Sequence, residues 1–205
     1  MITTFKLMRQ VIVHPIDFYH YIQEQGKITW GQGIFVVLLA YLARMAGLLL
    51  TGYAYETQET YEISFLHEFI WIIVPWLTWT VSNWGVSAIL EGEGKFKEVF
   101  VGSAFAFAPY AVFTVPITVL TNVLALDEQS IYSFLINMTF VWVAWLLLLK
   151  VRVIHDFEIV KMIWITVLSI IGILIIWFIG LLLYGLMNQL VHFLIDIFKE
   201  VNFRR

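Results

Sequence analysis

Four stretches of the chain run without a charged residue over lengths that are unusual outside membranes. They extend from 69 to 90, from 99 to 126, from 129 to 149 and from 162 to 195. A fifth apolar stretch, 33–50, is interrupted only by Arg44. A helix rises about 1.5 Å per residue, so about 20 apolar residues cross a hydrocarbon core of about 30 Å. The pattern therefore predicts an integral membrane protein.

The same stretches predict helices rather than the strands of a barrel. Barrel strands alternate polar and apolar side chains over about ten residues, whereas these stretches are apolar on all faces and longer. We expect an all-α bundle with spans at about 33–51, 68–90, 99–126, 130–150 and 162–186. Little sequence remains between the spans, so residues 1–205 are expected to form a single membrane domain.

Both ends of the chain show weaker, helix-like periodicity. In 1–32, the apolar residues Phe5, Met8, Ile12, Ile16 and Tyr19 predict two short helices at the inner membrane surface, separated at His14 and Pro15. In 187–205, an apolar stripe is formed by Leu190, Phe193, Leu194, Ile197 and Val201. This amphipathic tail is expected to be an outer interfacial helix or a continuation of the fifth helix beyond the membrane.

Composition supports the membrane assignment and excludes functions that depend on cysteine. Hydrophobic residues make up 61% of the chain and charged residues 13%, whereas soluble domains carry about a quarter charged residues. The chain has no cysteine, which excludes disulfides, thiolate metal ligands and thiol nucleophiles within this sequence.

The basic residues predict the orientation. Eight lie before the first span or near the second and fourth connections: Lys6, Arg9, Lys27, Lys95, Lys97, Lys150, Arg152 and Lys161. Three follow the fifth span: Lys199, Arg204 and Arg205. By the positive-inside rule, we expect a multi-pass protein of the cell membrane with a cytoplasmic N-terminus and an outer C-terminus. The acidic first connection, with Glu56, Glu59 and Glu62, is interpreted as a solvated surface rather than a cation-attracting patch.

Arg44 is the most unusual residue within a span. An arginine near the centre of a span costs about 2.5–3.5 kcal/mol on insertion scales, so it needs water or a partner. Glu68 enters the second span from the same side of the membrane, which makes it a candidate partner. An Arg44–Glu68 pair would be a structural clamp or part of an ion path, and structural pairing or snorkelling of Arg44 is favoured.

The third span carries a packing and kinking pattern. Small residues recur four apart, as Gly102 with Ala106 and as Ala104 with Ala108, which favours close helix packing. Pro109 and Pro116 each remove a backbone hydrogen bond and predict kinks. A discontinuous transporter helix would carry similar features, but a kinked and closely packed core helix is favoured. In the second span, Asn83 is expected to hydrogen-bond between helices rather than to bind substrate.

No catalytic or metal-binding pattern emerges. The five histidines have no HExxH spacing, and no GxSxG occurs. The expected inner side holds His14, His20, His155, Asp156 and Glu158. These residues could form an inner metal site, but structural roles are favoured. We expect no catalytic residue, no cofactor, no metal and no nucleic-acid partner.

Several of these features together resemble the Yip domain family of Ypt/Rab-interacting membrane proteins, in its short bacterial form. They are His14-Pro15, the five spans, a glycine-rich turn followed by Phe96-Lys97-Glu98-Val99, and Ala106-Phe107-Ala108-Pro109. The resemblance implies a five-helix bundle with a cytoplasmic N-terminus. Eukaryotic members contact small GTPases through a longer N-terminal region and a Tyr-Gly-Pro motif. Since this sequence has neither, we do not expect a GTPase partner.

Three classes of function are compared. The favoured one is a non-enzymatic scaffold or adaptor that binds another membrane protein or itself through small-residue helix faces and inner loops. The alternative is a small transporter or channel that uses Arg44, Glu68 and the proline-broken third span. An intramembrane enzyme acting on lipid ranks last, because the sequence offers no nucleophile with a base or a metal.

Overall fold

The computed structural model describes residues 2–24, 28–55 and 64–203, and this part of the chain is built from helices alone. The α-helices are α1 (Ile2–Val13), α2 (Pro15–Gln23), α3 (Trp30–Leu50), α4 (Phe65–Ile89), α5 (Phe96–Phe105), α6 (Ala108–Leu120), α7 (Gln129–Ile154) and α8 (Ile159–Phe203). The 3₁₀ turns are η1 (Tyr53–Tyr55) and η3 (Leu126–Glu128). The predicted acidic residues Glu56, Glu59 and Glu62, and the basic residues Lys27, Arg204 and Arg205, lie outside the described residues.

Within the described part, five helical stretches are long and apolar enough to cross a membrane. They are Trp30–Leu50, Phe65–Ile89, Phe96–Leu120, Leu126–Ile154 and Ile159–Glu200. The expected all-α polytopic fold is confirmed. The bounds of the first, second and fourth lie within about four residues of the expected spans, whereas the third ends six residues earlier than expected and the fifth extends well beyond the expected end at about 186.

Local sequence explains where the helices begin. Pro15 occupies the first turn of α2, where its fixed φ suits a helix and its missing N–H is not needed. Before α3, the Thr29 backbone N–H donates to Gln32 Oε1 over 2.8 Å. Before α5, the Lys95 backbone N–H donates to Glu98 Oε2 over 3.1 Å, and Glu98 lies in the positive first turn of that helix.

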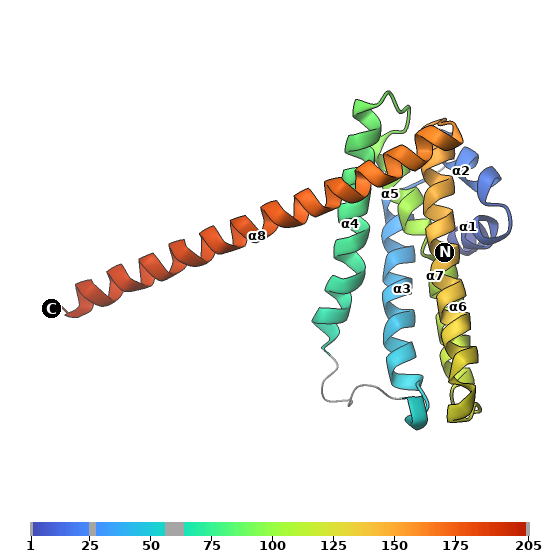
Figure 1. Cartoon of the computed structure of the whole chain (residues 1–205), viewed down its shortest axis with the longest axis horizontal. Helices are drawn as coiled ribbons and strands as arrows, with labels where there is room; N and C mark the ends of the chain where they lie inside the picture. Colours follow the sequence, from blue (N-terminus) through green and yellow to red (C-terminus); the bar gives the residue numbers. More distant parts are fainter. Residues whose placement is uncertain (1, 25–27, 56–63, 204–205) are drawn as a thin grey trace.

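The bundle has two distinct ends (Figure 1). The connections α4–α5 and α7–α8 lie at the same end as α1 and α2, whereas η1 and the α6–α7 connection lie at the opposite end. The helices α3, α4 and α7 run between these ends, as do α5 and α6 taken together. The alternation agrees with successive crossings of one membrane.

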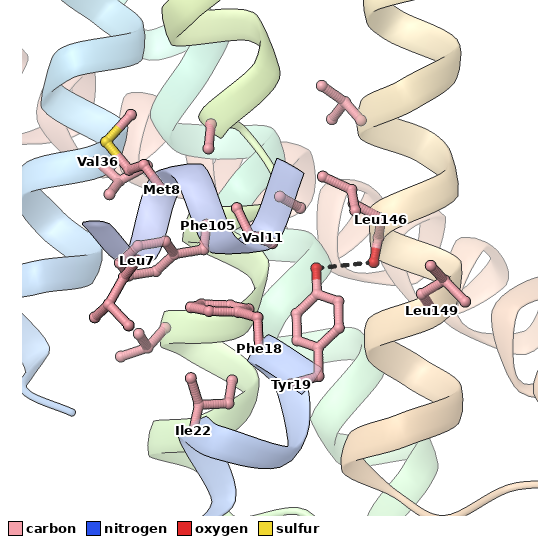
Figure 2. Packing of buried hydrophobic residues seen from close by; sticks show 14 of the residues in the cluster. Leu7, Met8, Val11, Phe18, Tyr19, Ile22, Val36, Phe105, Leu146 and Leu149 are labelled. Atoms are coloured by element: carbon pink, nitrogen blue, oxygen red, sulfur yellow. Dashed lines mark hydrogen bonds between the residues drawn. The ribbon is translucent and has the colours of Figure 1, made fainter. Parts of the chain in front are cut away.

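Helices α1 and α2 pack into the main core instead of only covering a membrane surface. Figure 2 shows Leu7, Met8 and Val11 of α1 and Phe18 of α2 gathered around Phe105 of α5. The Tyr19 hydroxyl donates to the backbone carbonyl of Leu146 in α7 over 3.0 Å.

The apolar residues expected on these two helices divide between two faces. Met8 and Tyr19 are buried in the core, whereas Phe5 is 51% exposed and Ile16 48% exposed. A short helix with apolar residues on more than one face does not reveal which face meets the protein. Here the face with Leu7 and Val11 meets the protein, and Phe5 instead contacts Phe35 ring-to-edge.

Helix α8 differs from the rest of the bundle. It is a single helix of 45 residues that crosses α4 and then extends away from the other helices (Figure 1). Met162, Ile165 and Ser169 are buried near its start, whereas every residue from Trp177 to Glu200 is exposed. We call the part of α8 from Trp177 to Phe203 the α8 arm. The tail thus continues the helix of the fifth span as far as Phe203, which is one of its two expected forms.

Candidate functional site

The two candidate polar residues Arg44 and Glu68 meet between α3 and α4. Ser64 caps α4, because its hydroxyl accepts the His67 backbone N–H over 3.4 Å, and Glu68 lies in the first turn. Arg44 Nε donates to Glu68 Oε2 over 2.9 Å. The side chain of Arg44 is 39% exposed and that of Glu68 is 11% exposed. The pair joins two helices and leaves part of the guanidinium open.

The open side of the pair faces a cavity of about 460 Å³, which we call the polar chamber. Besides Arg44 and Glu68, its walls include His67, Trp71, Tyr110 and Phe140. The Trp71 indole Nε1–H donates to His67 Nε2 over 2.8 Å, which orders this wall of the chamber. Pro75 of α4 and Phe107 also line it, at the end away from the start of α4.

A second cavity of about 220 Å³ shares Pro75 and Phe107 with the first, and we call it the apolar chamber. Trp76 and Trp79 of α4, Leu147 of α7, and Ile173 and Trp177 of α8 also line it. The indole N–H groups of Trp76 and Trp79 are buried and have no hydrogen-bond partner within the described residues.

The third span is interrupted where the sequence carries its small residues. Helix α5 ends at Phe105 and α6 begins at Ala108, with Pro109 in the first turn of α6. Pro116 lies inside α6, which continues to Leu120. The break at 106–107 brings Phe107 to the boundary between the two chambers.

The small residues of this span face other helices of the same chain. Gly102, Ala104, Ala106 and Ala108 are all buried. A Cβ on Gly33 of α3 would lie 3.4 Å from Ala104 Cβ, and one on Gly102 would lie 3.1 Å from Lys150 Cγ. Because these faces are filled within the chain, they are not open to a partner, contrary to the expectation that partners bind there.

Sequence reasoning missed a buried lysine. Lys150 was assigned to the fourth connection, but it lies within α7 and is fully buried. Its ammonium donates to Asn83 Oδ1 of α4 and, over 3.2 Å, to Ser103 Oγ of α5, and it lies 5.7 Å from the centre of the Trp79 ring. No carboxylate partner is recorded for Lys150 in the described part of the chain.

The hydrogen bonds continue from Asn83 into α8. Asn83 Nδ2 donates to Ser169 Oγ over 3.2 Å, and Ser82 Oγ donates to the Ser169 carbonyl over 2.6 Å. Asn83 therefore does bond between helices, and its neighbours connect α4, α5, α7 and α8. The sequence contained one signal for this cluster. Asn83, Ser103 and Ser169 lie inside apolar spans, where polar side chains need hydrogen-bond partners.

His155 lies next to this cluster in the α7–α8 connection and apart from the other candidate inner ligands. The Gly94 N–H donates to His155 Nδ1 over 3.2 Å, and the ring stacks on Phe157. By contrast, His20, Asp156 and Glu158 line a different cavity, with Arg152. Burial, together with the positive charge of Lys150, lowers the pKa of His155 to about 3.

This pKa gives a prediction for acid stability. Because the folded protein holds His155 neutral, its contribution to stability is complete above pH of about 6.5, the ordinary histidine value. We expect this contribution to be lost as the pH falls from there towards 3. Ring ¹⁵N shifts of labelled protein should show His155 neutral, with its proton on Nε2, from pH 8 down to pH 4. A His155 titration midpoint near 6.5 would contradict the burial and the Gly94 hydrogen bond.

Five apolar spans and a core of packed helices define a multi-pass membrane protein. Comparison with known families matches residues 9–182 to the Yip1 domain. The chain therefore belongs to the Yip1 domain family, and the resemblance carried by its glycine-rich turn and Ala-Phe-Ala-Pro run is confirmed. No curated protein and no solved structure matches it.

Proposed function

We propose that this protein is a non-enzymatic scaffold or adaptor in the cell membrane, and that the α8 arm binds the helices of a neighbouring membrane protein or of a second copy. The observation that carries the proposal is the length of α8 combined with the exposure of its arm. The α8 arm takes the place of the small-residue faces as the proposed partner surface, because those faces are buried within the chain.

The apolar part of α8 is too long to cross a bilayer without a strong tilt. The charge-free run from 162 to 195 is about 50 Å long at 1.5 Å per residue, whereas the hydrocarbon core is about 30 Å thick. To remain in that core, the run must incline by about 50° from the membrane normal, beyond the usual range of about 0–40°. Packing against neighbouring helices sets such tilts, and only the first part of α8 packs on α4 and α7. A helix from another molecule would support the rest.

The proposed orientation has α1, α2 and the α4–α5 turn in the cytoplasm. It is supported by the exposed basic residues Lys6, Arg9, Lys95 and Arg152 at that end. Lys150 is left out of the basic residues counted for the positive-inside rule, because it is buried within α7. The C-terminus follows an odd number of crossings and is proposed to lie outside.

Shortening the arm tests the scaffold. Removal of residues 187–205 leaves about 40 Å of α8, enough to cross a bilayer, and removes no residue whose side chain the structure describes as buried. After cross-linking in native membranes, the full chain should purify with a stoichiometric partner or as an oligomer. The shortened chain should give at least about tenfold less cross-linked partner or oligomer than the full chain. If the full chain is a solitary monomer, or if both chains recover the same partner equally, the proposal fails.

A small transporter remains the second candidate, because the polar chamber reaches Arg44 and Glu68. The cluster around Lys150 fills the bundle interior near the opposite end, so a solute path would require α4 and α7 to separate there. In reconstituted liposomes, transport predicts solute or ion flux that Arg44→Ala abolishes. Absence of flux over a broad panel of solutes would reject it.

A further inference from the structure

The two chambers together have the layout of an amphipathic molecule. They share Pro75 and Phe107 as lining residues and are therefore neighbours. The polar chamber ends on an ion pair, whereas the apolar chamber is lined by side chains such as Trp76, Leu147 and Ile173. A volume of about 460 Å³ for the polar chamber is within the range of about 300–1,000 Å³ that is usual for ligand pockets.

The depths of the chambers match those of a lipid in the same membrane leaflet. Glu68 lies in the first turn of α4, close to the end of the span. Pro75 and Trp79 lie seven and eleven residues further along, which places them about 10 and 16 Å deeper at 1.5 Å per residue. A phospholipid likewise places its charged headgroup near the surface and its acyl chain towards the middle of the bilayer.

The charges favour a zwitterionic headgroup. Arg44 and Glu68 form a pair of opposite charges, and the guanidinium is partly exposed to the chamber. A phosphate can bond to the free guanidinium N–H groups, while an ammonium can approach the carboxylate. A purely anionic headgroup would bond to Arg44 but would be repelled by Glu68.

The unpaired indole groups add an independent observation. Trp76 is only 4% exposed, and its buried N–H has no partner within the described residues. A buried donor without a partner costs about 1–3 kcal/mol. Among the acceptors of a phospholipid, the ester carbonyl at the start of the acyl chain is the one that would come nearest to this wall of the apolar chamber.

We infer that the two neighbouring chambers bind one phospholipid with a zwitterionic phosphoethanolamine headgroup. The phosphate lies against Arg44, the ammonium lies near Glu68, and one acyl chain enters past Pro75 and Phe107 into the apolar chamber. The site shares only Trp177, the first residue of the α8 arm, with the proposed partner surface.

Native mass spectrometry of the detergent-purified, delipidated chain tests the site. With added dioleoyl phosphatidylethanolamine, we expect one lipid retained per chain. The double variant Arg44→Gln/Glu68→Gln removes both charges, so that neither is left unpaired. It should weaken lipid retention at least about tenfold. Ile173→Phe, which fills the apolar chamber, should also weaken it. Arg152→Gln, at the other end of the bundle, should retain lipid like the unmodified chain.

Two further probes separate a lipid site from a phosphate site. Glycerophosphoethanolamine carries the headgroup without chains and should bind far more weakly, with no sensitivity to Ile173→Phe. Phosphatidylethanolamine with brominated acyl chains should quench tryptophan fluorescence, and Ile173→Phe should reduce the quenching. The inference is overturned if folded double and Ile173 variants retain lipid as the unmodified chain does. It is also overturned if the chain-free headgroup or an anionic phosphatidylglycerol binds equally well.

Discussion

Replacing Asn83 with leucine is expected to destabilise the bundle by about 2–3 kcal/mol, the upper part of the range for losing a buried hydrogen bond to a charged group. Asn83 Oδ1 accepts a hydrogen bond from the fully buried Lys150 ammonium. After the substitution, Ser103 Oγ would be the remaining hydrogen-bond acceptor of Lys150. The free energy of unfolding, measured by SDS titration in mixed micelles, reports this change.

The matched control removes the charge itself. Lys150→Met keeps much of the side-chain volume and leaves only neutral groups, so its cost should be about 1–2 kcal/mol, close to that of one unpaired buried acceptor. Substitution of the residue that carries the charge should thus cost less than substitution of its neutral partner. Equal effects, or a cost below about 1 kcal/mol for Asn83→Leu, would contradict the buried cluster.

The second large effect is expected at Gly172, where α8 crosses α4. A Cβ at this position would collide with Ser82 Oγ, which donates to the Ser169 carbonyl. Gly172→Leu should force the helices apart and cost at least about 1–3 kcal/mol, as overpacking does in other cores. The same SDS titration measures the effect, and cross-linking between α4 and α8 measures the separation.

Gly180 provides the control on the same helix. A Cβ there would have nothing within 4 Å in this chain, so Gly180→Leu should change the unfolding free energy by no more than about 0.5 kcal/mol. A comparable loss of stability in both variants would mean that the contact between α8 and α4 is assigned wrongly.

The sequence predicts best those features that depend on charge and length alone. The charge-free runs locate the five spans, because burying charge in hydrocarbon is costly wherever the helices pack. Arg44 and Glu68 could be considered together for the same reason, since each lies in a span and enters from one side. That they meet at 2.9 Å is a result of the helix packing.

Lys150 shows where this reasoning fails. A lysine directly after an apolar run, followed by Arg152, has the pattern of a cytoplasmic connection. Helix α7 continues to Ile154, however, and turns Lys150 inward against Asn83 and Ser103. Partners on α4 and α5 are distant in sequence, so hydropathy alone could not identify them.

The continuous helix α8 is one of two forms that the sequence leaves open. Its charge-free run is longer than one bilayer thickness, but the expected span ends at about 186, and the remainder is expected either as an outer interfacial helix or as a continuation of the same helix. No proline or other helix-breaking signal follows Gly185 in this tail, and the helix continues to Phe203. The continuous helix is what creates the α8 arm.

Photo-cross-linking from the α8 arm tests the scaffold most directly. A photoreactive residue at Leu183, on the arm, is compared with one at Trp145 of α7, since both side chains are 56% exposed. In native membranes, we expect Leu183 to give one dominant protein adduct, either a second copy or another membrane protein, and Trp145 to give mainly lipid adducts. If both positions give only lipid adducts on a monomeric chain, the arm is a lipid-facing helix and the scaffold proposal is wrong.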